Sequence, residues 1–173
     1  MAKAEVLARL EPLPREGVRL NEVAWVRHVA TRGLSRAEEH GRWTDGGRAQ
    51  LAFRLPERPE AGVTLFLQSL GFVAPGFVNE QRVGVAVNGT ALPDLVARDT
   101  VMRTRAIEVP PEAIRPDGVV VLDLLVSTCV QPALLGISND DRFLGILLST
   151  VTPRRAGASG RAGGGVAMER PSR

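Results

Sequence analysis

The chain has 173 residues, of which 44% are hydrophobic and 24% are charged, a balance typical of a single globular domain rather than of a disordered or membrane-spanning chain. Its formal net charge of +3 is concentrated at one end: residues 1–151 carry 17 Lys and Arg against 18 Asp and Glu, whereas residues 152–173 carry five against one. The body therefore has no basic stripe that could follow a phosphate backbone, and we expect no nucleic-acid partner.

Cysteine and histidine are too few for several kinds of site. Cys129 is the only cysteine, so no intramolecular disulfide can form, and one Cys with two His cannot assemble the usual zinc site. We therefore expect no metal and no cofactor. The first ten residues lack the apolar run of a signal peptide, and no window approaches the ~20 apolar residues of a transmembrane helix. These observations predict a cytoplasmic location and no transmembrane segment.

The N-terminal part of the chain gives weak structural signals. Residues 2–10 are compatible with either a helical turn or a first strand, and Pro12 and Pro14 end whichever of them forms. We therefore treat residues 1–17 as a segment of uncertain structure. Between residues 18 and 30 the apolar positions fit neither the helical nor the strand period, and we predict one short strand over residues 24–28.

A clearer pattern begins at the segment GRWTDGG, residues 41–47, which we predict to be a tight loop because its glycines permit a sharp turn. It leads into residues 48–56, where Ala49, Leu51, Phe53 and Leu55 alternate with more polar positions. This period of two predicts a half-buried strand entered through the loop.

Further strands follow at spacings of about ten to fifteen residues. Residues 63–70 are apolar on both faces, which indicates a central strand. Residues 82–87 alternate and meet Asn88-Gly89, a pair that favours a type I′ hairpin turn and a return strand from Thr90. Residues 112–115 are long enough for one helical turn. Loops are expected over residues 71–80 and 128–142, and the remaining strands over residues 101–109, 119–126 and 143–151.

About eight strands separated by Pro and Gly turns, without a long amphipathic helix, predict an all-β fold: an antiparallel two-sheet β-sandwich of jelly-roll type. We place this domain at residues 18–152. From residue 153 onward Arg, Gly, Ala and Ser dominate without periodicity, so residues 153–173 are expected to form a disordered tail.

The segment GLSRAEEHGRWTDG, residues 33–46, resembles the signature of a bacterial accessory β-sandwich domain, in which Gly-aromatic-Ser is followed by a short acidic stretch and Gly-x-Trp-Ser/Thr-x-Gly. Residues 81–89, 119–126 and 132–145 are similar to later parts of that domain. It is attached to glycosyltransferases and other enzymes that build surface polysaccharide, and in related form to membrane-bound phosphoglycerol transferases. Two departures stand out: Leu34 replaces an aromatic residue, and His40 replaces a second Trp.

The resemblance implies a non-catalytic, carbohydrate-binding-like accessory module in surface polysaccharide assembly, whose partner is a glycan. The alternative is a docking module that binds a glycosyltransferase and has no glycan affinity. The candidate ligand-binding residues are Arg42, Trp43, Asp45, Asn139, Asp141 and Arg142. Trp43 could stack on a sugar ring while Arg42 and Asp45 bind hydroxyls. Alternatively, Trp43 caps one end of the sandwich and Asp45 stabilises its own loop as an Asx-turn.

The polar run of residues 139–142 also has more than one interpretation. It could join the Trp43 loop in a binding site, or hold calcium through carboxylates and carbonyls. Its three consecutive acidic or amide residues lack the alternate spacing of a calcium loop, so a turn with Asp141 paired to Arg142 is favoured. A salt bridge from Arg42 to Asp141, or from Asp45 to Arg142, would instead make both segments structural.

A small hydrolase is the remaining alternative. It would use Cys129 with His28 or His40 as a nucleophilic dyad. Because Cys129 directly follows an apolar strand, a buried, inert thiol is the more ordinary expectation. We assign no catalytic residue.

Overall fold

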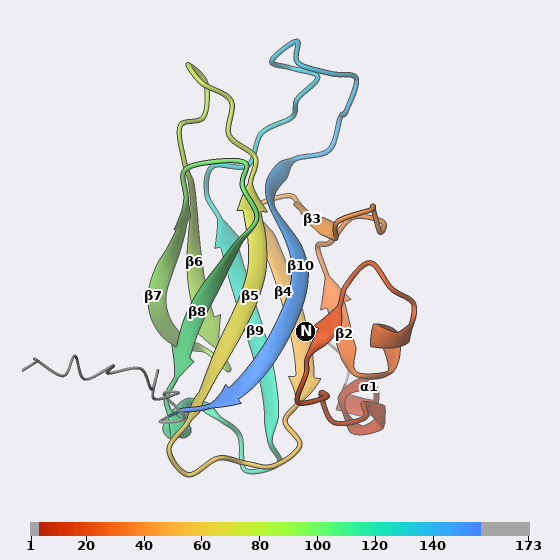
Figure 1. The fold of residues 1–173 in the computed structure, drawn as a ribbon, viewed down its shortest axis with the longest axis vertical. Coiled ribbons are helices and arrows are strands. Elements are labelled where there is room, and N and C mark those ends of the chain that lie inside the picture. Colours follow the sequence, from red (N-terminus) through yellow and green to blue (C-terminus); the bar gives the residue numbers. More distant parts are fainter. Residues whose placement is uncertain (1–3, 157–173) are drawn as a thin grey trace, which may run out of the picture.

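A computed structural model describes residues 4–156 of the chain. They form two antiparallel five-stranded sheets packed face to face (Figure 1), which confirms the predicted all-β sandwich of jelly-roll type. None of the helices in this range is long and apolar enough to cross a membrane.

One sheet has the strand order β1-β10-β5-β8, with β3 also paired to β10, and the other has the order β2-β4-β9-β6-β7. The strands of the first sheet are β1 (Val18–Arg19), β3 (Arg42–Asp45), β5 (Val63–Gly71), β8 (Arg103–Val109) and β10 (Leu144–Arg155). Those of the second are β2 (Val29–Arg32), β4 (Arg48–Arg54), β6 (Gln81–Val87), β7 (Thr90–Ala97) and β9 (Val119–Val126). The helices are α1 (Ala4–Arg9), η1 (Ala24–Arg27) and η2 (Pro111–Ala113), the last two being 3₁₀ turns.

The core lies between the sheets and is built from alternate residues of the central strands. Leu51, Leu122 and Leu148, from β4, β9 and β10, are completely buried. The predicted strand over residues 48–56 is confirmed as β4, which ends at Arg54. It is buried on both faces, since Gln50 and Ala52 on its other face are only 7% and 1% exposed. It is a central strand with β2 and β9 on its two sides, and the Gln50 amide donates to Asp123 Oδ1 of β9 at 3.0 Å.

The Asn-Gly hairpin is confirmed. Asn88 has φ of 49° and Gly89 has φ of 87°, the positive values that a type I′ turn requires. The turn connects β6 to β7 in the register Val87↔Thr90. The predicted helical turn at residues 112–115 lies one or two residues earlier, as η2.

Three sequence predictions are wrong in their details. The GRWTDGG segment is not a loop throughout, because Arg42–Asp45 forms β3 and pairs with the much later β10. Residues 24–28 are not a strand: η1 occupies residues 24–27, turns Trp25 into the core, and is followed by β2. The last strand does not end at Val151, because β10 continues to Arg155 opposite Val63 of β5. The disordered tail predicted beyond it lies, from residue 157 onward, outside the described residues.

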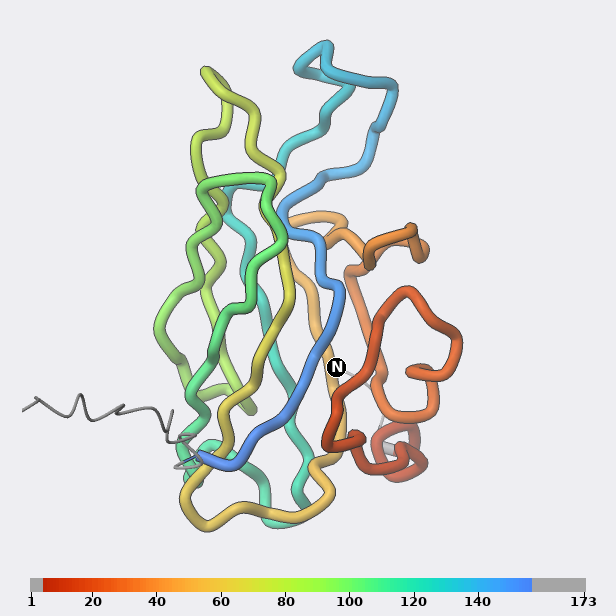
Figure 2. The backbone as a smooth tube through the Cα atoms, in the orientation of Figure 1, coloured from red at the N-terminus to blue at the C-terminus, as the bar shows by residue number. Residues whose placement is uncertain are grey.

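The N-terminal segment belongs to the sandwich. It begins with α1 and runs along one edge of the molecule, as the backbone trace shows (Figure 2). Leu13 is 1% exposed and packs in the core, and its backbone N–H donates to Arg54 O of β4 at 2.7 Å. Of the two possibilities for residues 2–10, the helical one is confirmed within the described residues, as α1 (Ala4–Arg9).

Candidate functional site

The two segments that carry the candidate ligand-binding residues are brought together by backbone pairing. Ser35 N–H donates to Trp43 O at 2.8 Å, and Asp45 N–H donates to Gly33 O at 2.9 Å, which fold residues 33–41 back on β3. Gly46 N–H then donates to Phe143 O at 2.9 Å. The chain before β10 therefore meets the chain around β3 at one end of the sandwich (Figure 1).

An open polar pocket of about 570 Å³ lies at this junction. Four of the six predicted residues line it, together with three that the prediction did not include. The lining residues are Ser35, Arg36, Asp45, Asn139, Asp140, Asp141 and Arg142. The volume is in the range of small-ligand sites. The structure thus places Asp45 beside the 139–142 run although nearly one hundred residues separate them in sequence.

Arg142 is the structural centre of the pocket wall. Its guanidinium donates to both oxygens of Asp140, with Nη2 2.6 Å from Oδ2 and Nε 2.9 Å from Oδ1, and its Nη1 lies 2.7 Å from Glu38 Oε1. The bidentate bond to Arg142 lowers the pKa of the Asp140 carboxyl. The hydrogen bonds to Asp140 and Glu38 in turn raise the pKa of the Arg142 guanidinium. The predicted pairing of Asp141 with Arg142 is therefore wrong, since the adjacent carboxylate takes that place.

Asp45 joins the two segments through a backbone group. Its Oδ1 accepts a hydrogen bond from Phe143 N–H at 3.1 Å, so its carboxylate does not close an Asx-turn in its own loop. Neither proposed salt bridge, Arg42 to Asp141 or Asp45 to Arg142, is among the ion pairs of the described residues. The two segments are nevertheless joined by an ion pair, because Arg142 binds Glu38.

Three side chains of the pocket remain available to a ligand. Within residues 4–156 no hydrogen bond is found for the Asp141 carboxylate, the Asn139 amide or the Arg36 guanidinium, and all three are exposed. Asp141 is held through its backbone, whose carbonyl accepts from Gln131 Nε2 at 2.6 Å. The pocket therefore presents a hydrogen-bond acceptor, an amide and a cationic donor on a fixed wall.

Arg42 lies outside this pocket. Its guanidinium lies over the ring of Trp25, 4.9 Å from the centroid, and it donates to Leu20 O at 2.9 Å and to Ser35 O at 3.1 Å. Arg42 thus connects the N-terminal segment to β3, and its cation lies against Trp25 and not on the pocket wall.

Trp43 also lies outside the pocket. Its ring meets that of Phe72 edge to face, with centroids 6.2 Å apart and planes at 75°. The side chain is half-buried at the outer side of the β3–β10 pairing. Trp43 therefore makes a packing contact with Phe72 and contributes nothing to the pocket wall.

Ser35, Arg36 and Asp140 are the lining residues that sequence reasoning did not select. Ser35 is buried, and its Oγ accepts a hydrogen bond from Trp43 N–H at 3.2 Å. This bond attaches the Ser35 side of the pocket to β3. All three lie within the segments on which the resemblance rests. The sequence could have indicated these three residues only through their position in those segments, because they form no motif of their own.

Cys129 does not have the surroundings of a nucleophile. Burial raises the pKa of its thiol, and the negative charge of Asp45 adds to this effect, so the unreactive protonated form is favoured. His28 Nδ1 lies 2.8 Å from Pro12 O, at the N-terminal segment. No cluster of three or more His, Cys, Asp or Glu suited to a metal occurs within residues 4–156.

No protein-family model matches the chain, and no curated protein is similar to it. Among solved structures it is similar to the CBM36-1 domain of a multidomain xylanase from the hindgut metagenome of Trinervitermes trinervoides, at 12% identity and a TM-score of 0.48, covering 75% of this chain and 91% of that one. It is also similar to a carbohydrate-binding module CBM36 in complex with calcium and xylotriose, at 6% identity and a TM-score of 0.45, covering 79% of this chain and 98% of that one. A third similar structure is a family 35 carbohydrate-binding module from an environmental isolate, at 15% identity and a TM-score of 0.42, covering 83% of this chain and 86% of that one. At TM-scores below 0.5, the likeness is one of general β-sandwich architecture.

Proposed function

We propose that the chain is a non-catalytic glycan-binding module that serves bacterial surface polysaccharide assembly in the cytoplasm, and that the pocket around Asp141 is its binding site. The observation that carries the proposal is the set of three polar side chains, Arg36, Asn139 and Asp141, that line one open pocket and have no hydrogen-bond partner within residues 4–156. Sugar hydroxyls both donate and accept hydrogen bonds, and a carboxylate, an amide and a guanidinium together match both roles.

The pocket wall supports this role because it is organised before any ligand arrives. Arg142 fixes Glu38 and Asp140, and Asp45 fixes the backbone at Phe143. A ligand would therefore bear little of the entropic cost of ordering the loop. Because Trp43 packs on Phe72 outside the pocket, the proposed site recognises a sugar by hydrogen bonds more than by aromatic stacking.

The test is a calorimetric titration of the full chain with a panel of bacterial surface oligosaccharides. For any saccharide that binds, Asp141→Ala is expected to weaken affinity at least tenfold, because it removes an exposed pocket carboxylate that could accept from sugar hydroxyls. Glu112→Gln is the control: it removes another exposed acid, on η2, for which no hydrogen bond is found within the described residues.

Binding by the wild type that is lost in Asp141→Ala and kept in Glu112→Gln supports the proposed site. Equal binding by both variants excludes this pocket. A flat response across the panel contradicts the glycan-binding function itself.

A second function, docking to a glycosyltransferase, is favoured by a different observation. The loops over residues 72–80 and 127–143 project from the end of the sandwich (Figure 1) and expose Phe77, Leu134 and Ile137, which are 66%, 77% and 51% accessible. Residues 72–79 and 131–139 contain no charged side chain. Exposed apolar side chains on projecting, uncharged loops are typical of protein-interaction surfaces.

Docking predicts that the chain co-purifies with a surface-polysaccharide glycosyltransferase and that the triple variant Phe77→Ser, Leu134→Ser, Ile137→Ser does not. Asp141→Ala should leave this capture unchanged, because its side chain belongs to the pocket and not to the loop tips. Failure of the wild type to capture any such transferase would exclude the docking function.

A further inference from the structure

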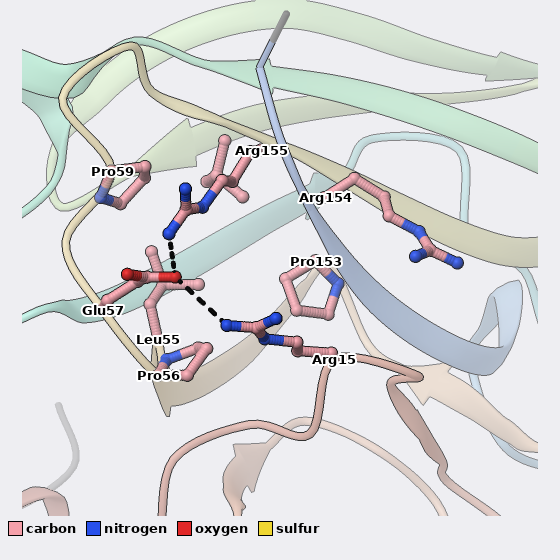
Figure 3. A pocket seen from close by; sticks show the side chains of 9 residues that line it. Arg15, Leu55, Pro56, Glu57, Pro59, Pro153, Arg154 and Arg155 are labelled. Carbon is pink, nitrogen blue, oxygen red and sulfur yellow. Dashed lines mark hydrogen bonds and ion pairs between the residues drawn. The ribbon is translucent and has the colours of Figure 1, made fainter. Parts of the chain in front are cut away.

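A second, apolar pocket of about 210 Å³ lies at the other end of the sandwich (Figure 3). The twelve-residue β10 links the two ends: it begins at Leu144, next to the polar pocket, and ends at Arg155, which lines the apolar one. The apolar pocket shares no residue with the polar pocket.

Buried apolar residues form the floor of this second pocket. Leu55 is 4% exposed and Val63 is 3% exposed, and both belong to the main core. Pro153 of β10 is buried beside them, and Pro56 and Pro59 complete the wall. The pocket thus rests against the edge of the core where β4 leads into β5.

A chain of three charged side chains spans the mouth of the pocket (Figure 3). Glu57 Oε1 is approached by Arg15 Nη2 at 3.5 Å and, more closely, by Arg155 Nη2. These side chains are 47%, 81% and 64% exposed, in the order Glu57, Arg15, Arg155, so the ion pairs are solvated and contribute little to stability. Arg154 points away from Glu57.

We propose that this pocket binds a small carboxylate with an apolar body, whose carboxylate replaces Glu57 between the guanidiniums of Arg15 and Arg155. Glu57 already shows that the two cations can hold a single carboxylate oxygen above the apolar floor. The three charges at the mouth sum to one positive charge, which attracts an anion. Since Glu57 is held only by exposed pairs on a loop, its displacement is inexpensive, and burial of the apolar body against Leu55 and Val63 favours the exchange.

The volume sets the size of the ligand. A pocket of this size is smaller than a typical drug site, so the apolar body is a single ring or a short chain. Hexanoate is a suitable probe, since it carries both required features. Acetate has the carboxylate without the apolar body, and hexanol has the apolar body without the charge.

The experiment titrates hexanoate, acetate and hexanol into the full chain and follows backbone amide shifts by NMR, with those of Leu55 and Val63 as local reporters. Hexanoate is expected to bind saturably and at least tenfold more tightly than either of the others. Glu57→Gln should tighten hexanoate binding at least threefold, because it removes the competing carboxylate. The double variant Arg15→Ala, Arg155→Ala should weaken it at least tenfold.

Arg58→Ala is the matched control, because it removes an exposed arginine next to Glu57 that does not line the pocket. It should change affinity less than twofold. The inference is overturned if hexanoate does not bind to the Glu57→Gln variant, if hexanol binds as tightly as hexanoate, or if Arg58→Ala weakens binding as much as the double variant does. None of these results bears on oligosaccharide binding in the polar pocket.

Discussion

At the scale of single residues, Arg142 shows how one side chain can make a site without being its ligand-binding group. Its bond to Glu38 joins positions 104 residues apart, and its bidentate bond to Asp140 fixes the loop that precedes β10. The guanidinium fork suits this task because its donors lie in one plane and serve two carboxylates at once. The Asp141 carboxylate, by contrast, has no hydrogen-bond partner in the part of the chain that the structure describes.

Replacing Arg142 by Gln should therefore destabilise the fold by about 1–2 kcal/mol at pH 7, the range expected for charge-assisted hydrogen bonds that are partly exposed. Urea unfolding followed by Trp fluorescence measures this change. Arg36→Gln is the control, since Arg36 is an exposed arginine of the same pocket and its replacement should change the free energy of unfolding by less than about 0.5 kcal/mol.

The stability effect of Arg142 should also depend on pH. In the folded state the pKa of Asp140 is lowered, chiefly by its bond to Arg142, whereas in the unfolded chain it returns to about 3.9. The stabilisation is thus complete above the unfolded pKa and is lost as the pH falls through the lower, folded value. The difference between wild type and Arg142→Gln should shrink between pH 5 and the acid limit of the fold. A constant difference over that range would contradict the coupling.

At the scale of elements, the sequence predicts strands well where local alternation is strong and fails where pairing is distant. The strands β5, β6 and β9 were predicted within one residue or so at each end, because their apolar runs are bounded by Gly and Pro turns. By contrast, β3 has only four residues and exists through its pairing with β10. No local pattern encodes that partner.

The candidate site divides in the same way. The sequence was enough to select the residue types and the two segments of the site. It did not predict which carboxylate Arg142 binds or on which face of the sheet Trp43 lies. Adjacent Asp140 and Asp141 are equivalent in sequence, and only the turn that bonds Asp140 Oδ1 to Arg142 N–H at 3.0 Å distinguishes them. Arg42 was misassigned for a related reason, because its partner Trp25 reaches it through a 3₁₀ turn that the sequence did not reveal.

Asn88 shows a role at the element scale that the hairpin signal hides. Beyond its positive φ, its side-chain amide donates to Ala113 O at 2.8 Å and to Val119 O at 3.0 Å, and its Oδ1 accepts from Val121 N–H at 3.0 Å. The turn between β6 and β7 is thereby attached to η2 and to the start of β9. The residue closes a hairpin and also joins it to its neighbours.

Asn88→Gly should accordingly destabilise the fold by about 2–3 kcal/mol in chemical unfolding, although Gly tolerates the turn conformation, because three hydrogen bonds with part-buried groups are lost. Asn88→Ala should cost about 1 kcal/mol more, the strain of a positive φ in a residue with a Cβ. If Asn88→Gly is as stable as the wild type, the residue acts through the turn alone.

At the scale of the whole molecule, the two ends of the sandwich differ in chemistry. One end carries the polar pocket and the uncharged loop tips, and the other carries the apolar pocket under its Arg-Glu-Arg chain. The strands between them form one continuous core, so a variant at either end should leave binding at the other unchanged as long as the fold persists.

That core also includes the N-terminal segment, which the sequence left unassigned. Leu13 is 1% exposed against the core, whereas Val6 on α1 is 44% exposed. Leu13→Ala should therefore destabilise the fold by about 2–4 kcal/mol through lost burial and an unfilled cavity, while Val6→Ala serves as the control and should cost less than about 1 kcal/mol. Thermal or urea unfolding in a single transition, shifted only by Leu13→Ala, would establish that residues 4–17 fold with the sandwich. Equal stability of the two variants would mean that this segment contributes nothing to it.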